Sequence, residues 1–128
     1  LSQDRPTVVL VDPLSTGVLL QQRVFSLGYR VILVWSDRSQ PASRERHFGR
    51  SGYTQQDFAT IITHEAGELQ DTLNKILAVT NNIVAVMCGS EHGVLLEDQI
   101  AEILMDEADV TVKKMSYDDV MKAQQNMR

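Results

Sequence analysis

Short runs of β-branched and other apolar residues alternate along this chain with longer stretches in which apolar residues recur at helical spacing. The runs are Thr7–Val11, Arg30–Trp35, Phe58–Thr63 and Ile83–Cys88. Continuous apolar runs of this length are typical of strands that are buried on both faces of a sheet. Because strands and helices alternate, the sequence predicts an α/β fold with an open, mainly parallel, Rossmann-like sheet and helices on both faces.

Three of the stretches that separate or follow these runs carry an apolar stripe. The stripes consist of Leu20, Val24 and Leu27, of Leu69, Leu73, Ile76 and Leu77, and of Leu96, Ile100, Ile103 and Leu104. Gly28 follows the first stripe and suits the left-handed residue just past a helix end. These stretches predict helices whose apolar sides pack against the sheet.

The polar segment 37–56 shows no clear period and is predicted to be a long surface loop. It contains residues that often interrupt regular structure: Pro41, Gly49 and Gly52. Long loops inside compact domains are often functional. The basic residues Arg44, Arg46 and Arg50 are nevertheless interpreted as a solvated part of this loop, rather than as a phosphate site, because acidic residues outnumber basic ones in the chain.

Beyond residue 105 the apolar pattern weakens. A short edge strand is expected at Val110–Val112, and a final helix is expected at Tyr117–Met127. Residues 1–128 are therefore predicted to form one domain, with a core over about 7–105 and a closing segment over 106–128.

Composition limits the classes of function. The net charge is −5, so a general attraction to nucleic acid or to an anionic membrane is not expected. No apolar run approaches the roughly 20 residues of a membrane-spanning helix. Cys88 is the only cysteine, which excludes an internal disulfide and suits the cytoplasm or another reducing compartment.

Two loops that follow predicted strands have the character of a ligand site, because ligands of open parallel sheets bind beyond the carboxyl ends of the strands. The candidate substrate-binding residues are Ser15, Thr16 and Gly17 after the first strand, and Gly89, Ser90, Glu91 and Gly93 after the fourth. Such loops can receive an anionic group at a helix N-terminus, or their hydroxyls can simply cap the helices. Neither loop matches a dinucleotide fingerprint or a phosphate loop. We expect the two loops to lie side by side at one rim of the sheet.

The other titratable residues are interpreted as structural. Glu91 and His92 are adjacent, but neighbouring side chains at a helix start usually point in different directions, so no catalytic pair is predicted. His47 and His64 stand alone without the spacing of metal ligands, and no metal site is predicted. The solvent side of the helix near residue 100 is expected to carry Glu97, Asp98 and Glu102.

Two segments of the chain resemble the front (pre-ATP-grasp) domain of ATP-grasp carboxylate–amine ligases. Val8–Gly17 is similar to the opening strand and loop of that family, and Gly89–Ala101 resembles its segment G-S-E-P-G-V-x-L-A-D-x-L-A. His92 replaces the usual proline and Glu97 the usual alanine, and both changes suit a solvent-facing helix start. The similarity covers roughly residues 7–105.

The resemblance implies a mechanism in which ATP and Mg²⁺ convert a carboxylate to an acyl phosphate, from which an amine displaces phosphate. In that family the nucleotide and metals lie between later subdomains. The resemblance therefore implies that this domain lends loops to the substrate side, holds no cofactor and no catalytic residue, and is inactive alone. Its partners would be a downstream ATP-grasp domain or a partner chain, and small carboxylate and amine substrates.

One further residue enters through the resemblance. The family has a lysine that reaches the nucleotide phosphates near the position of Lys113–Tyr117 here. If Tyr117 aligns with the family's tyrosine, Ser116 occupies the lysine position, and if the register slips by two, Lys114 does. Lys114 is equally compatible with a solvated residue before a helix.

Two alternatives remain open from the sequence. A non-catalytic binding or scaffold module could retain a degenerate pre-ATP-grasp fold. A receiver- or flavodoxin-like signalling domain shares the alternating pattern, but receiver chemistry needs clustered acidic residues, and no second acidic residue adjoins Asp12.

Overall fold

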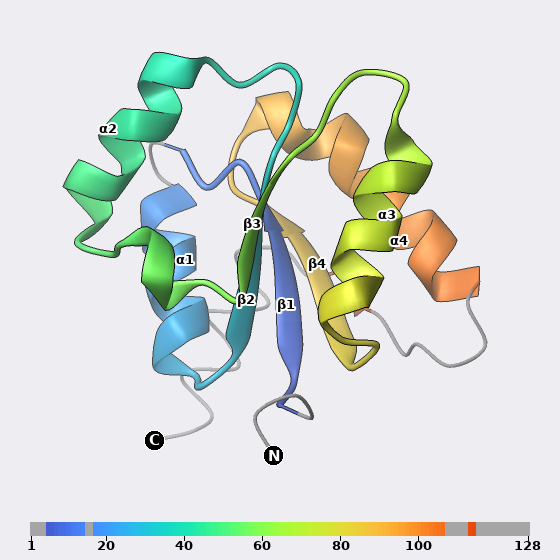
Figure 1. The fold of residues 1–128 in the computed structure, drawn as a ribbon. Coiled ribbons are helices and arrows are strands. Elements are labelled where there is room, and N and C mark those ends of the chain that lie inside the picture. Colours follow the sequence, from blue (N-terminus) through green and yellow to red (C-terminus); the bar gives the residue numbers. More distant parts are fainter. Residues whose placement is uncertain (1–4, 15–16, 107–112, 115–128) are drawn as a thin grey trace.

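The protein folds as an all-parallel, five-stranded sheet with the strand order β3-β2-β1-β4-β5. The computed structural model describes residues 5–14, 17–106 and 113–114. The strands are β1 (Thr7–Val11), β2 (Arg30–Trp35), β3 (Thr60–Thr63), β4 (Ile83–Cys88) and the two-residue β5 (Lys113–Lys114). The predicted fold class, an open Rossmann-like α/β sheet, is confirmed (Figure 1).

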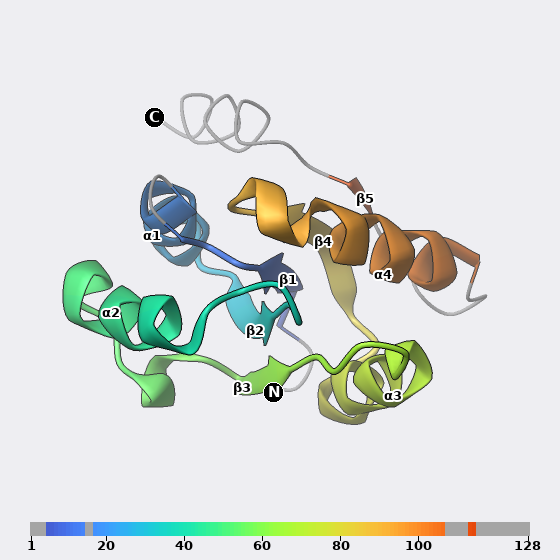
Figure 2. The ribbon, with the colours of Figure 1, turned by 90° about the horizontal axis from the view of Figure 1, so that it is seen from above.

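Helices cover both faces of the sheet. On one face lie α1 (Gly17–Ser26) and α2 (Pro41–Ser51), and on the other lie α3 (Leu69–Val79) and α4 (Val94–Asp106), as Figure 2 shows. Residues of the central strand alternate between the two cores. Val8 and Leu10 pack in the cluster that includes Leu20 of α1, whereas Val9 and Val11 pack in the cluster that includes Ile100 of α4. A strand buried on both faces in this way explains the continuous apolar runs.

The order of the strands creates a switch point between β1 and β4. From β1 the chain adds β2 and then β3 on one side, and it next crosses to the other side of β1 to form β4. The loops after β1 and β4 therefore diverge into helices on opposite faces of the sheet (Figure 2). In open α/β sheets the crevice at such a point is the usual ligand site.

The prediction of a long loop over 37–56 is wrong, because α2 occupies Pro41–Ser51 and a short 3₁₀ helix, η2, follows at Gln55–Asp57. Pro41 stands in the first turn, where its missing N–H costs nothing, and Gly52 takes the left-handed conformation with φ of 78° at the end of the helix. The helix escaped detection because its fully buried residues, His47 and Ser51, are polar. An apolar period cannot reveal such a helix.

Most of the remaining elements agree with expectation. β1, β2 and β4 have their predicted bounds, and β3 begins at Thr60 instead of Phe58. Gly28 has the expected left-handed φ of 89°. The following predicted stripe residues are buried: Leu20, Val24, Leu73, Ile76, Leu96, Ile100 and Leu104.

Glu97 is a second correction, because it is 5% exposed and does not lie on the solvent face, whereas Asp98 and Glu102 are exposed. It stands in the first turn of α4, and its carboxylate is close enough to the Cys88 thiol to raise the pKa of that thiol. The predicted strand at 110–112 and helix at 117–127 lie outside the described residues. None of the described helices is both long enough and apolar enough to span a membrane.

Candidate functional site

The loops after β1 and β4 lie side by side, as the sequence predicted. A Cβ atom added to Gly89 would stand 2.4 Å from the Cα of Pro13, and one added to Gly17 would stand 2.6 Å from the carbonyl oxygen of Gly89. Real Cβ atoms essentially never come so close to backbone. The two loops therefore meet backbone to backbone, and only glycine fits at either position.

Gly93, in the short 3₁₀ helix η3 (Glu91–Gly93), also allows a close approach that a larger residue would prevent. A Cβ atom there would lie 2.8 Å from a methyl carbon of Val11 and 3.0 Å from the sulfur of Cys88. The three candidate glycines thus share a structural reason, which is the close approach of one chain segment to another. We call Gly17, Gly89 and Gly93 the loop rim.

A buried carboxylate joins the loops after β1 and β2 behind the loop rim. Asp12 is fully buried and has a φ of 47°, the only positive φ among the described non-glycine residues. Its carboxylate accepts a hydrogen bond from the backbone N–H of Ser36 at 2.8 Å and another from the Ser36 hydroxyl. The same hydroxyl oxygen lies 3.5 Å from the carbonyl oxygen of His92. Since a hydroxyl has one hydrogen, the bond to Asp12 takes it, and the contact with His92 is one of proximity.

The same network fixes the start of α2. The Ser39 hydroxyl donates to the Ser36 carbonyl at 2.8 Å. Arg44, in the first turns of α2, donates from Nε to the Ser39 hydroxyl at 2.8 Å and from Nη2 to the carbonyl oxygens of Ser36 and Ser39 at 3.2 and 3.0 Å. α2 is therefore anchored to the end of β2 and, through Ser36, to Asp12 at the end of β1.

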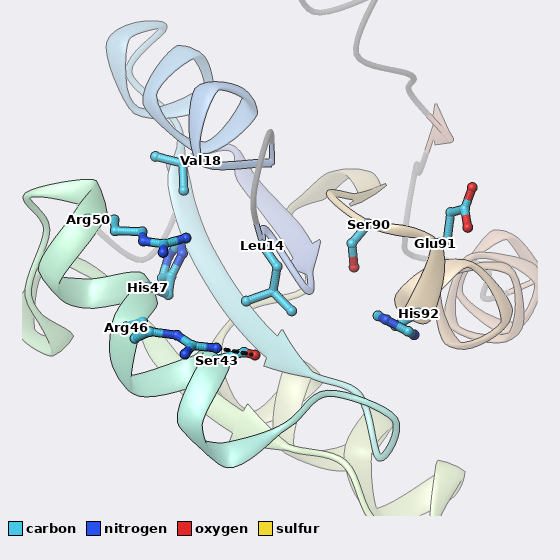
Figure 3. A pocket seen from close by; sticks show the side chains of 9 residues that line it. All are labelled: Leu14, Val18, Ser43, Arg46, His47, Arg50, Ser90, Glu91 and His92. Atoms are coloured by element: carbon cyan, nitrogen blue, oxygen red, sulfur yellow. Dashed lines mark hydrogen bonds between the residues drawn. The ribbon is translucent and has the colours of Figure 1, made fainter.

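A pocket of about 380 Å³ lies at the switch point, between α2 and the loops after β1 and β4 (Figure 3). Its lining comes from three sources: Leu14 and Val18 around the first loop, Ser43, Arg46, His47 and Arg50 from α2, and Ser90, Glu91 and His92 after β4. Its size falls in the range typical of small-molecule sites.

Two exposed arginines make one wall of this pocket positive. Arg46 and Arg50 are one helical turn apart on α2, and Figure 3 shows both guanidinium groups on the pocket side of the helix. Arg46 donates to the Ser43 hydroxyl at 3.3 Å, and neither arginine forms an ion pair with the residues the structure describes. Glu91 also lines the pocket, but its carboxylate is directed away from them (Figure 3). We call Arg46 and Arg50 the arginine wall.

His47 lies between the two arginines in sequence and is 2% exposed. Its Nε2 pairs with the Gln21 side-chain oxygen at 2.8 Å. Burial lowers the pKa of His47 below 6.5, an effect that the Pro13 carbonyl partly opposes. The ring is therefore neutral at pH 7 and adds no charge to the pocket. His64, by contrast, lies away from the pocket lining and pairs with the Thr72 hydroxyl at 2.7 Å, a structural arrangement.

Buried polar atoms without a hydrogen-bond partner gather at this pocket. Within the described parts of the chain they are Nε2 of Gln21, Nδ1 of His47 and Oγ of Ser90. The Pro13 carbonyl is near enough to His47 to raise its pKa, yet it makes no hydrogen bond of normal geometry with Nδ1. Two of the three atoms belong to residues that line the pocket, and the third belongs to the partner of His47. Unsatisfied buried groups are rare in native proteins and often mark functional sites.

The thiol of Cys88 is unsuited to nucleophilic chemistry at neutral pH. Burial raises the pKa of Cys88 to about 11, with smaller contributions from the nearby carboxylates of Glu97 and Asp12. The thiol donates a hydrogen bond to the Ser90 carbonyl at 2.7 Å. Across the described ranges, no three His, Cys, Asp or Glu side chains come together in a way that could hold a metal ion.

The sequence located the loops of the site but missed its charged wall. Ser90 and Glu91 line the pocket, the candidate glycines form the loop rim, and Ser15 and Thr16 lie outside the described residues. Lys114 belongs to β5, where its Cα pairs with that of Val86. The basic residues lie in α2 and not in the predicted loop, although Arg46 and Arg50 are exposed, as a solvated position requires. A signal for the wall was present, because Arg46 and Arg50 have helical spacing between a proline and a glycine that delimit a helix.

Comparison of the chain with protein-family models, with curated proteins and with solved structures finds no match.

Proposed function

We propose that this chain is the front domain of an ATP-dependent carboxylate–amine ligase that works through an acyl phosphate, and that it is not catalytic alone. The observation that carries the proposal is the meeting of its two family-like segments: the loops after β1 and β4 pack against each other beside a pocket at the switch point. The two segments lie far apart in the sequence and occur in the same order as in the ligase family. In the fold they contribute to one site of the size of a small ligand.

The proposal divides the work between this domain and further polypeptide. The pocket holds a small carboxylate or amine substrate on the substrate side, with Ser90 as a polar surface and the Leu14 side chain as an apolar one. ATP and magnesium are assigned to a downstream ATP-grasp domain or a partner chain, which also supplies the charge neutralisation that phosphoryl transfer requires. Lys114, in β5, is the residue of this domain that the family resemblance directs toward the nucleotide.

An isotope experiment tests the chemistry. The complete translated polypeptide that contains these residues is first screened for ATP-dependent phosphate release with panels of amino acids. The active acid is then supplied with an ¹⁸O-labelled carboxylate. Because the carboxylate oxygen attacks the γ-phosphorus and leaves with phosphate when the amine attacks the carbonyl carbon, one label appears in the released phosphate for each amide formed.

Two results would contradict the proposal. One is amide formation with no label in the phosphate, and the other is sustained ATP turnover by the 128-residue chain alone. The expected result for that chain is no ATP hydrolysis, with or without amino acids.

A non-catalytic binding or scaffold module is the second candidate, and the loop rim favours its scaffold form. Each of the three glycines has other protein atoms where a Cβ would stand, so their common role is to pack the loops together. The encoding reading frame discriminates the candidates: translation that ends near Arg128, without a co-purifying ATP-grasp chain, supports the binding module. A receiver-like role is disfavoured, because Asp12 is fully buried and its carboxylate is engaged by Ser36.

A further inference from the structure

We propose that the arginine wall is an oxyanion-binding site, and that the ligand of the pocket carries a carboxylate or phosphate group held by Arg46 and Arg50. The inference rests on the proposed function in treating this pocket as the substrate side, and it adds the chemical class of the group that is bound there. Neither arginine belongs to the segments that resemble the ligase family. The site follows from the placement of α2 beside the pocket.

The first argument is the placement of two like charges on one helix face. Residues four apart on a helix are neighbours, and two cations at that spacing repel each other. Arg46 and Arg50 nevertheless both line the pocket, and neither is neutralised by a carboxylate of the described chain. An oxyanion between the two guanidinium groups would relieve this repulsion, and their planar N–H groups match the oxygens of carboxylate and phosphate.

The second argument is the contrast with Arg44 on the same helix. Arg44 is half-buried, and its guanidinium group donates three hydrogen bonds to Ser36 and Ser39. Arg46 makes one long contact with Ser43, and no hydrogen bond to the described residues is present at Arg50. Arg44 therefore has a structural role, whereas the donors of Arg46 and Arg50 remain largely available to a ligand.

The third argument comes from the opposite wall. The Ser90 hydroxyl is buried and has no partner among the described residues, and Figure 3 shows its side chain facing the same space as Leu14 and His92. Buried polar groups normally find partners. A ligand with several oxygens, bound from the arginine wall toward Ser90, provides acceptors for a hydroxyl that now has none.

Two probes separate the sources of the oxyanion. The 128-residue chain, labelled with ¹⁵N, is titrated with sodium phosphate and, in a parallel series, with sodium succinate. Sodium chloride holds the ionic strength constant. Saturable shifts are expected for the backbone amides around Leu14 and Ser90 and for the Nε–H signals of Arg46 and Arg50. Preference for phosphate identifies a phosphoryl group, and preference for succinate identifies a carboxylate.

Three variants test the assignment to the arginine wall. Arg46→Gln and Arg50→Gln each remove one charged donor, so each should weaken binding at least about tenfold, the scale of one charge-assisted hydrogen bond. Arg38→Gln removes the same charge from an exposed residue outside the pocket lining, so it should change the affinity less than about twofold. Since all three side chains are exposed, the variants should remain folded, and circular dichroism checks this.

The inference is overturned if neither probe gives saturable shifts in the wild-type chain, or if Arg38→Gln weakens binding as much as the wall variants do. Its failure is distinct from that of the proposed function. If the chain binds an oxyanion through the arginine wall but the complete polypeptide transfers no ¹⁸O to phosphate, the oxyanion site is supported and the ligase function is contradicted. If ¹⁸O is transferred but no oxyanion binds at the arginine wall, the ligase function is supported and the oxyanion site is contradicted.

Discussion

The loop rim lies behind the residues that line one side of the pocket, the arginine wall lines the other side, and the two regions are built in opposite ways. At the loop rim, glycine backbones pack so closely that a single Cβ on Gly89 would stand 2.4 Å from a neighbouring Cα. At the arginine wall, long side chains are exposed and have almost no partners in the described chain. The loop rim has no space for a larger side chain, whereas the arginine wall has hydrogen-bond donors that are free to bind a ligand.

This difference separates residues that build the site from residues that can recognise a ligand. The glycines hold the loops after β1 and β4 together, so their effect on function passes through the fold. Arg46 and Arg50 do not pack in either core cluster, so their removal should affect binding and leave the fold intact. Substitutions in the two regions should therefore separate stability from affinity.

The largest expected effect is the loss of stability in Gly89→Ala. The added methyl group meets the Cα of Pro13 and the carbonyl oxygen of Asp12, at 2.4 and 2.9 Å, and both are backbone atoms that cannot rotate away. We expect the free energy of unfolding to fall by about 3 kcal/mol, the upper range for overpacked sites. Urea denaturation followed by circular dichroism measures the change.

Gly49→Ala is the matched control for this substitution. Gly49 lies in α2, and a Cβ atom there would have no neighbour within 4 Å. Because alanine favours helix more than glycine does, this variant should gain up to about 1 kcal/mol. Equal stability of the two variants would show that the loops do not pack as closely as described.

The second expected effect is at Asp12, which connects the loop rim to α2. Asp12→Ala removes both acceptors of the Ser36 hydrogen bonds and leaves a buried N–H unpaired, so we expect a loss of about 2 kcal/mol. Asp12→Asn keeps an acceptor and tolerates the positive φ of this position, so it should lose less. A larger loss in the asparagine variant would contradict this account of the network. Urea denaturation of both variants shows which of them loses more unfolding free energy.

A smaller effect is expected at Arg44, the structural arginine of α2. Arg44→Lys retains the charge but cannot reproduce the three hydrogen bonds to Ser36 and Ser39. We expect a loss of about 1 kcal/mol in stability and, because α2 carries the arginine wall, a few-fold weaker binding of the oxyanion probe. Arg38→Lys, at an exposed position, should change neither quantity. Normal stability of Arg44→Lys would show that α2 is held by other contacts.

The sequence was most informative where burial imposes a simple pattern. β1, β2 and β4 are buried strands, and their unbroken apolar runs predicted their bounds and the parallel sheet. From the parallel sheet followed the position of the loops after β1 and β4, since the carboxyl ends of parallel strands share one edge. The pairing of Gly17 with Gly89 is the local consequence of that arrangement.

The arginine wall was not predicted, because α2 contacts the rest of the protein in an unusual way. Its buried residues are His47 and Ser51, and its half-buried residues include Arg44. Hydrogen bonds to Gln21, Ser36 and Ser39 hold it, together with the ring contacts of the single half-buried Phe48, and one aromatic residue does not make an apolar stripe. Such partners come from distant parts of the chain and leave no local period. The burial of Glu97 has a similar cause, since it depends on the packing of α4 near Cys88 rather than on the helix itself.

The smallest expected effect is a pH dependence that joins the two regions through His47. Burial lowers its pKa in the folded protein below 6.5, so the unfolded chain takes up a proton first as the pH falls. Stability from this residue is complete above about pH 6.5 and decreases as the pH falls toward the lower pKa of the folded state. His47→Gln should reduce the slope of unfolding free energy against pH in that interval, and equal slopes would refute the assignment. Saturating sulfate, an oxyanion that does not titrate in this interval, should also reduce the wild-type slope, because an oxyanion at the arginine wall favours the protonated ring, and this reduction should vanish in Arg46→Gln.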